Sequence, residues 1–271
     1  MSDFVKITEQ SSLYNNLEKK DVGTILKEIN QEDHKIADAV EKTLPIIEQL
    51  VEEMIPRLER GGRIFYIGAG TSGRIGVLDA SEIPPTFGMP PTLFIGLIAG
   101  GDVALRNPVE NAEDTEEMAW HDLQEHRINE NDTVIGIAAS GTTPYVVAGI
   151  REARKRGILT AGVTSNPGSP VALAADHAIV TVVGPEYVTG SSRMKSGTAQ
   201  KLVLNMISTT LMIKTGRVEG NKMVNMQLSN KKLVERGTNI LVERLGLNPE
   251  LARRELLEAG SVRAVLDKYE S

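Results

Sequence analysis

The feature that most constrains the fold is a short apolar run that leads through a glycine-rich loop into a helix. Arg63–Ile67 is rich in β-forming residues and is bounded by glycine, which predicts a buried strand. The loop Gly68–Gly73 (GAGTSG) follows, and Arg74–Ala80 continues as a short helix. Backbone N–H groups in such a turn, together with the positive end of the helix dipole, favour a bound anion.

The same unit occurs a second time. A strand at 133–138 runs into ASGTTP and then into a helix from Tyr145 to Lys155. Further strands are expected at 92–98, 158–163 and 178–183. Strands that alternate with helices predict an α/β fold with a doubly wound parallel sheet, here of five strands flanked by helices, and ligands bind at the carboxyl ends of such strands.

Both loops carry hydroxyl side chains, which suit the terminal phosphate of a sugar phosphate. These candidate phosphate ligands are Thr71, Ser72, Ser140, Thr142 and Thr143. Two other interpretations stay open. In the first, the loops are tight turns that need glycine and bind nothing. In the second, Ser140 only caps the helix that follows it.

The spacing of Gly68, Gly70 and Gly73 also fits the dinucleotide fingerprint GxGxxG. That fingerprint needs an acidic residue about 20 positions further on to hold the ribose. The second predicted strand instead reads PTLFIGLIAG, which contains no acid. A nicotinamide-dependent enzyme is therefore disfavoured, and we expect no cofactor.

Composition excludes several classes of protein. Hydrophobic residues make up 41% and charged residues 24%, which is ordinary for a globular chain. The net charge is −6 without a basic tract, which argues against nucleic acid or an anionic membrane as a partner. There is no cysteine, the four histidines have no metal-binding spacing, and no apolar run reaches the roughly 20 residues of a membrane span. We expect a cytoplasmic protein without a bound metal.

Helical periodicity covers both flanks of the sheet region. Apolar residues recur at helical spacing over 22–60, where Pro45 and Pro56 predict kinks or breaks. Residues 108–127 predict one helix with acids crowded at its start, where they stabilise the helix dipole. From Val218 onward the pattern predicts a pair of amphipathic helices.

Residues 184–201 (GPEYVTGSSRMKSGTAQK) form the most unusual segment. Glu186, Arg193 and Lys195 stand just before a strongly apolar helix at 202–213. Cations beside a helix N-terminus oppose its dipole, which indicates an anion or a carboxylate nearby. The alternative is a surface loop with solvated charges.

Several long strings resemble one known family. GAGTSGRIGVLDASEIPPTFG, IAGGDVALRNPVENAEDT, IAASGTTPYV and GPEYVTGSSRMKSGTAQKLVLNM are similar to the N-acetylmuramic acid 6-phosphate etherase family of the sugar isomerase (SIS) domain superfamily. The last string is also similar to the glucokinase regulatory protein. The likeness runs from about Thr8 to about Gly237. The chain departs from the family in a shorter C-terminal region and in Ile83 before the Pro-Pro pair.

The resemblance implies a SIS-type sheet domain and a domain plan. We expect an N-terminal helical arm at 1–52, a phosphosugar-binding domain at 53–216 and a C-terminal helical region at 217–271. It also implies a cytoplasmic homodimer with shared active sites, and a lyase of cell-wall amino sugar recycling. That lyase removes the lactyl ether of N-acetylmuramic acid 6-phosphate to give N-acetylglucosamine 6-phosphate and D-lactate.

The family's two catalytic glutamates fall on Glu82, in ASEIPP, and Glu113, in ENAEDT. We interpret Glu113 as the base at carbon 2 and Glu82 as the acid that protonates the departing lactate oxygen, because elimination needs one ionised and one protonated carboxyl group. The expected substrate ligands are the five hydroxyls of the two loops together with Glu186, Ser191, Arg193 and Lys195.

Two other functions on the same fold remain open. A non-catalytic phosphosugar sensor, like the glucokinase regulator, would keep the phosphate loops and lose the glutamate pair. An aldose–ketose isomerase would also need a base near carbon 2, and residues 184–201 argue against it.

Overall fold

A computed structural model describes residues 4–270. The chain forms two compact units: residues up to Ala80 with Phe94–Ile207, and Ser81–Leu93 with Ser208 onward. Residues 1–3 and 271, the outer ends of the expected arm and C-terminal region, lie outside the described residues. The expected domain bounds at 52/53 and 216/217 stay a prediction.

The first unit contains a five-stranded sheet in which every neighbouring pair is parallel, with strand order β2-β1-β3-β4-β5. This confirms the predicted sheet. β1, β3 and β4 are buried along their whole length, as expected for a parallel sheet covered on both faces. The strands are β1 (Ile64–Gly68), β2 (Phe94–Ile98), β3 (Thr133–Ile137), β4 (Leu159–Thr164) and β5 (His177–Val180).

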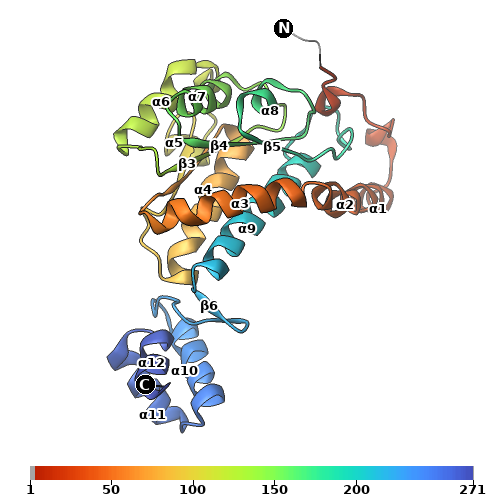
Figure 1. Cartoon of the computed structure of the whole chain (residues 1–271). Coiled ribbons are helices and arrows are strands. Elements are labelled where there is room, and N and C mark those ends of the chain that lie inside the picture. The colour runs from red at the N-terminus through yellow and green to blue at the C-terminus, as the bar shows by residue number, and fades with distance from the viewer. Residues whose placement is uncertain (1–3, 271) are drawn as a thin grey trace. The chain divides into compact units, whose positions relative to one another are not determined.

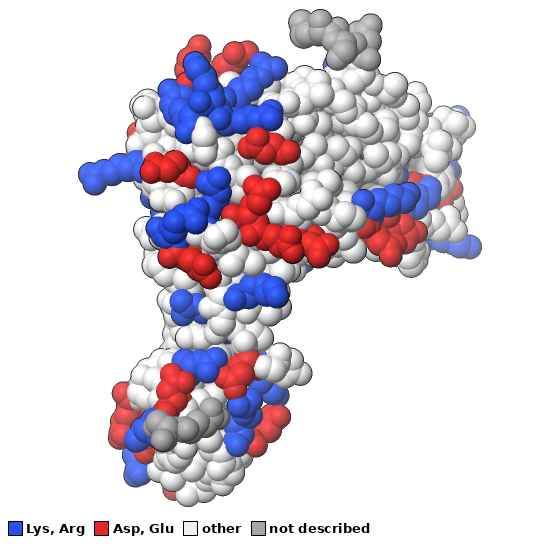
Figure 2. Space-filling view, in the orientation of Figure 1, with Lys and Arg blue, Asp and Glu red and all other residues white. Residues whose placement is uncertain are grey.

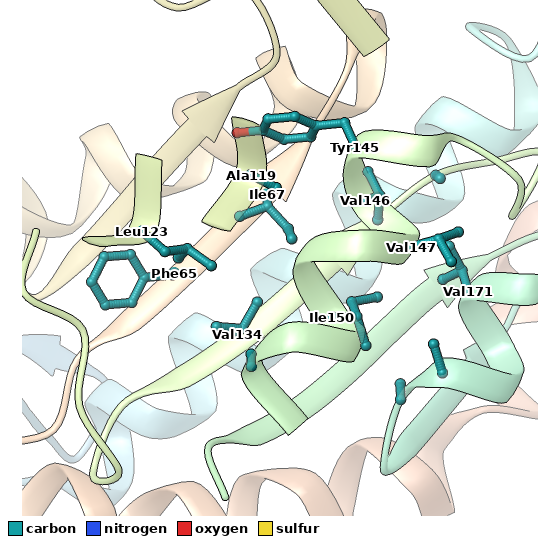
Figure 3. Packing of buried hydrophobic residues seen from close by; sticks show 14 of the residues in the cluster. Phe65, Ile67, Ala119, Leu123, Val134, Tyr145, Val146, Val147, Ile150 and Val171 are labelled. Carbon is teal, nitrogen blue, oxygen red and sulfur yellow. The ribbon is translucent and has the colours of Figure 1, made fainter. Parts of the chain in front are cut away.

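One face of this sheet carries the main core. Phe65 and Ile67 of β1 and Val134 of β3 point toward side chains from α6 (Glu116–Glu125) and α7 (Pro144–Lys155), among them Leu123 and Ile150 (Figure 3). The short α8 (Pro170–Ala174) closes the same face through Val171. Each fully buried aliphatic or aromatic side chain contributes roughly 1.5–3 kcal/mol, so this layer holds the strands in register.

Tyr66, which lies between Phe65 and Ile67 in β1, faces the opposite side of the sheet. Tyr66 packs against α4 (Gly70–Phe87), where a Cβ at Gly76 would lie 2.9 Å from the Cβ of Tyr66. Its hydroxyl lies 3.0 Å from Asp79 of the same helix. On this second face α3 (Leu44–Glu59) contacts β5, and Figure 1 shows it away from α6 and α7. The sheet is therefore covered on both sides.

The N-terminal segment contains two 3-10 turns, η1 (Ile7–Glu9) and η2 (Leu17–Lys19), followed by α1 (Val22–Asp33) and α2 (Lys35–Glu41). Pro45 stands in the first turn of α3, where a missing N–H is harmless. Of the kink or break expected at Pro56, the break is wrong and the kink stays a prediction. α3 continues to Glu59 because this proline lies in the last turn, close to where the helix ends anyway.

Two predicted helices have different bounds. α4 begins at Gly70, four residues earlier than expected, and continues through Pro84 and Pro85 to Phe87. The single helix expected at 108–127 is wrong. The chain instead forms α5 (Val103–Arg106), the turn η3 (Ala112–Asp114) and then α6, because Asn111 adopts a left-handed conformation with φ of 58°.

The second unit has its own apolar core, which includes Val234, Leu241, Leu256 and Val265. The expected helix pair is wrong, since three helices follow a short hairpin. Its elements are β6 (Val218–Glu219), β7 (Lys222–Met223), α10 (Lys231–Leu245), α11 (Pro249–Ala259) and α12 (Val262–Glu270). Across residues 4–270, no helix has the length and apolar character needed to cross a membrane.

Candidate active site

The two glycine-rich loops lie side by side because β1 and β3 are adjacent in the sheet. Gly68, the last residue of β1, pairs with Ile137, the last residue of β3. The chain continues from β1 to β2 on one side, while β3 lies on the other, so this is the point where the strand order reverses. Open α/β sheets bind ligands at that point, and the N-termini of α4 and α7 both begin there.

Glycine is required where α4 meets its strand. A Cβ at Gly73 would lie 2.6 Å from Cγ1 of Ile98 and 2.8 Å from the carbonyl oxygen of Gly68. Gly70 has a φ of +53°, which permits the sharp turn from strand to helix. These close approaches bring the first turn of α4 against the ends of β1 and β2.

A cleft of about 360 Å³ lies between the two loops. Five hydroxyl residues predicted from the sequence line it, and Glu113 lines it too. It also takes in Asp114 and Ser192, which sequence reasoning missed although each is the immediate neighbour of a residue it named. The lining residues are Ala69, Gly70, Thr71, Ser72, Glu113, Asp114, Ala138, Ala139, Ser140, Thr142, Thr143, Pro144 and Ser192.

A second hollow of about 240 Å³ shares Ala69, Gly70 and Glu113 with this cleft. Arg74 lines this hollow. Its guanidinium donates hydrogen bonds from Nε to the carbonyl of Leu105 at 2.9 Å and from Nη2 to that of Ala104 at 2.7 Å. Glu113 therefore lines both the hydroxyl-lined cleft and this second hollow.

The cleft hydroxyls contact one another and α9 (Lys195–Lys214). Thr142 donates to Oγ of Ser140 from its hydroxyl at 3.1 Å and from its backbone N–H at 3.3 Å. Ser72 donates to Oε1 of Gln200 at 3.0 Å, while Nε2 of that buried amide has no hydrogen-bond partner among residues 4–270. No Lys or Arg lines the cleft in the described part of the chain, so an anion there would depend on hydroxyls, backbone N–H groups and helix dipoles.

Glu186 and Lys195 are engaged inside the protein. The buried carboxylate of Glu186 accepts hydrogen bonds from the backbone N–H groups of Lys195 and Ser196, both at 2.9 Å, at the first residues of α9. Nζ of Lys195 lies 2.6 Å from Oε2 of Glu32. The prediction of a nearby carboxylate is confirmed for Lys195, whose partner Glu32 belongs to the protein itself, and for Arg193 it stays a prediction. Contact of Glu186 or Lys195 with substrate stays a prediction.

The remaining predicted residues occupy different positions. Ser191 is half-buried and Arg193 is exposed in the turn before α9, on either side of Ser192. Glu82 is exposed on α4 and belongs to the second compact unit. It lies within α4, which continues for five more residues to Phe87.

Other surface features are less suited to catalysis. Figure 2 shows Lys and Arg gathered over α7, where Arg154 pairs with Asp176 at 2.7 Å and Arg156 pairs with Glu152. A hollow of about 600 Å³ in the second unit is lined mainly by long exposed side chains such as Lys232. Within residues 4–270, no three His, Asp or Glu side chains gather so that they could hold a metal ion.

Comparisons with known proteins agree with this geometry. The model of the glucokinase regulatory protein N-terminal SIS domain matches residues 46–154, and the SIS domain model matches residues 104–209. An N-acetylmuramic acid 6-phosphate etherase of Bacteroides thetaiotaomicron is 67% identical over 267 residues, which are 98% of this chain and 96% of that protein. This chain belongs to the etherase family. The resemblance indicated by the sequence is thereby confirmed.

Other etherases show how the family varies in length. The etherase of Porphyromonas gingivalis strain ATCC 33277 is 66% identical over 96% of this chain and 95% of its own length. That of Clostridium beijerinckii is 54% identical over 89% of this chain, but only 79% of its own length is matched. The family therefore includes members close to this chain in length as well as longer ones.

Solved structures with the same fold have more distant sequences. A phosphoheptose isomerase from Francisella tularensis superposes with a TM-score of 0.52 at 22% identity, over 69% of this chain and 98% of that one. A putative phosphosugar isomerase from Bacteroides fragilis gives 0.53 at 23% identity, over 70% and 91%. At these identities the likeness establishes the SIS fold of the etherase chain and nothing further.

Proposed function

We propose that this protein is a lyase that cleaves the D-lactyl ether of N-acetylmuramic acid 6-phosphate, giving N-acetylglucosamine 6-phosphate and D-lactate in the recycling of cell-wall amino sugars. The observation that carries the proposal is the identity of 67% across 98% of the chain with an etherase. The lining of the cleft also supports the proposal, since the hydroxyl residues of both glycine-rich loops and Glu113 line the same space.

The phosphate would lie in the hydroxyl-lined cleft. Hydroxyls of Thr71, Ser140 and Thr143 surround that space, and the N-termini of α4 and α7 begin at it. A hydrogen bond to a charged group contributes about 1.5–3 kcal/mol. Loss of one hydroxyl should therefore weaken sugar phosphate binding by about tenfold or more.

The chemistry follows from the acidity of carbon 2 in the open-chain sugar, which lies next to the aldehyde. Glu113 removes that proton, and the electron pair forms a double bond to carbon 3 as the bond to the lactyl oxygen breaks. Glu82 gives its proton to the departing oxygen. Water then adds at carbon 3 and gives a proton to the Glu82 carboxylate, while Glu113, after exchanging its proton with solvent, protonates carbon 2, so atoms and charges balance.

The protein would act as a homodimer with shared active sites, in the cytoplasm. A phosphorylated sugar is charged and crosses no bilayer unaided, so the enzyme would meet it in the compartment where it is phosphorylated. If the two glutamates of one site come from different chains, mixing inactive Glu82→Gln and Glu113→Gln proteins restores part of the activity. If they come from one chain, the mixture stays inactive.

The test is release of D-lactate from N-acetylmuramic acid 6-phosphate by the purified full chain. Wild-type protein should release it, while Glu82→Gln and Glu113→Gln should each lower kcat by about a hundred- to ten-thousandfold, since each removes a proton-transfer group. Glu117→Gln, an exposed acid at the start of α6, serves as the matched control. Saturable binding of a sugar phosphate without lactate would instead indicate a phosphosugar sensor.

A further inference from the structure

A buried amide joins the N-terminal segment to one of the cleft loops. Asn166, in the loop after β4, is completely buried. Its Oδ1 accepts from the backbone N–H of Thr8 at 3.1 Å, and its Nδ2 donates to Oγ1 of Thr8 and to the carbonyl oxygen of Ser140, both at 2.9 Å. Both amide hydrogens and the amide oxygen are therefore used.

The carbonyl that Asn166 holds belongs to a residue of the cleft. Ser140 lines the candidate phosphate site, and its peptide group leads into Gly141, whose φ is +70°. Gly141 has no room for a side chain, since a Cβ would lie 2.1 Å from Oγ of Ser169. Ser169 and Asn166 thus fix the conformation of this loop from the side away from the cleft. Asn166 also contacts Thr8.

Thr8 is itself suited to this contact. It is 1% exposed although it lies in the short turn η1 near the start of the described chain. A second contact anchors the same segment, since Ser12 donates its backbone N–H to Oγ1 of Thr189 at 2.9 Å and its hydroxyl to the carbonyl of Tyr187 at 2.7 Å. That loop leads to Ser192, which also lines the cleft.

We infer that Thr8 and Asn166 are positioning residues for the phosphate-binding loop, an inference that rests on the proposed function for the identity of the ligand. Neither residue lines the cleft. Thr8 fixes the amide plane of Asn166, and the amide fixes the Ser140 carbonyl, so that the hydroxyl and the following N–H groups keep their direction toward the phosphate. A buried polar group that loses its partner is costly, which makes this arrangement sensitive to a single atom.

The test replaces the Thr8 hydroxyl with a methyl group. Thr8→Val keeps the shape and removes the acceptor for Nδ2, whereas Thr8→Ser keeps the hydroxyl. Ser11→Ala, an exposed serine of the same segment, is the control. Titration calorimetry with N-acetylglucosamine 6-phosphate gives Kd, lactate release gives KM and kcat, and thermal unfolding gives Tm.

We expect Thr8→Val to raise Kd and KM about five- to tenfold with kcat within twofold of wild type, and Thr8→Ser to restore most of the affinity. Asn166→Asp, which loses both donors, should weaken binding at least as much. Wild-type Kd in Thr8→Val and Asn166→Asp would overturn the inference, as would equal losses of affinity in Thr8→Val and Thr8→Ser. If wild-type protein released no lactate while Thr8→Val still weakened binding of this sugar phosphate, the positioning role would stand and the proposed function would fail.

Discussion

Nζ of Lys195 lies 2.6 Å from Oε2 of Glu32, and the two side chains are only 2% and 3% exposed. Glu32 also accepts from the hydroxyl of Tyr14 at 3.0 Å and pairs with Lys35 at 2.6 Å. The last turn of α1 is thereby joined to the first residue of α9. A buried ion pair is expensive to desolvate, so its partners are strongly interdependent.

Lys195→Met should therefore be destabilising, by about 3 kcal/mol, because it removes the buried ammonium partner of Glu32 and leaves the carboxylate with the half-exposed Lys35 and the hydroxyl of Tyr14. The double variant Lys195→Met/Glu32→Met should recover most of that loss. Urea unfolding followed by fluorescence measures both, since the single tryptophan, Trp120, lies in α6 of the first unit. A double variant no more stable than Lys195→Met would contradict this interpretation of the pair.

The same carboxylate predicts a pH dependence. Burial acts to raise the pKa of Glu32, but hydrogen bonds from Lys195, Lys35 and Tyr14 outweigh it and hold the pKa below its ordinary value of 4.5. A lowered pKa in the folded state gives stability that is present above pH 4.5 and is lost as the pH falls through the folded value. The stability difference between wild type and Glu32→Gln should therefore shrink below pH 4.5. A difference that stays constant down to pH 3 would show that the ionised carboxylate adds no stability.

The variant Glu186→Gln distinguishes two roles of Glu186, a cap of helix α9 and a ligand of the substrate. Its carboxylate accepts from two N–H groups at the start of α9, and the amide keeps only one acceptor and no charge. We expect a loss of about 1–2 kcal/mol of stability with KM for the phosphosugar unchanged. Glu52→Gln, which changes an exposed acid of α3, is the control for the loss of charge. A large rise in KM at unchanged stability would instead indicate contact with substrate.

Gln200 should influence phosphate binding through Ser72. With its amide reversed, Gln200 would donate to Oγ of Ser72 and leave the serine proton free for a phosphate oxygen, and the unpartnered Nε2 supplies that donor. Gln200→Met should weaken N-acetylglucosamine 6-phosphate binding about three- to tenfold. In a Ser72→Ala background the same change should have no further effect. Equal losses in both backgrounds, measured by calorimetry, would exclude action through this hydroxyl.

The sheet was predictable because its signals are local. Each strand is a short run rich in apolar residues, and the repeat of strand, hydroxyl loop and helix indicated that Ser72 and Ser140 would share one edge. The apolar pattern does not show which residues adopt a left-handed backbone conformation and so end a helix. The left-handed Asn111 ends the expected helix at 108–127 and places Glu113 in a separate turn.

Contacts between residues distant in sequence could not be predicted, because no local pattern indicates them. The charge of Lys195 beside a helix start indicated an anion or a carboxylate nearby, but not which one. The partner of Lys195 lies 163 residues away at Glu32, and Asn166 meets Thr8 across 158 residues. Such contacts are formed by the tertiary fold and leave no spacing in the sequence.

The measurement that tests the central claim most directly is product analysis in isotopic water. Wild-type protein is incubated with N-acetylmuramic acid 6-phosphate in D₂O and, separately, in H₂¹⁸O. We predict D-lactate without solvent oxygen, and N-acetylglucosamine 6-phosphate that carries deuterium at carbon 2 and ¹⁸O at carbon 3. Lactate that carries ¹⁸O, or a sugar product without deuterium at carbon 2, would contradict elimination and readdition by the proposed glutamate pair.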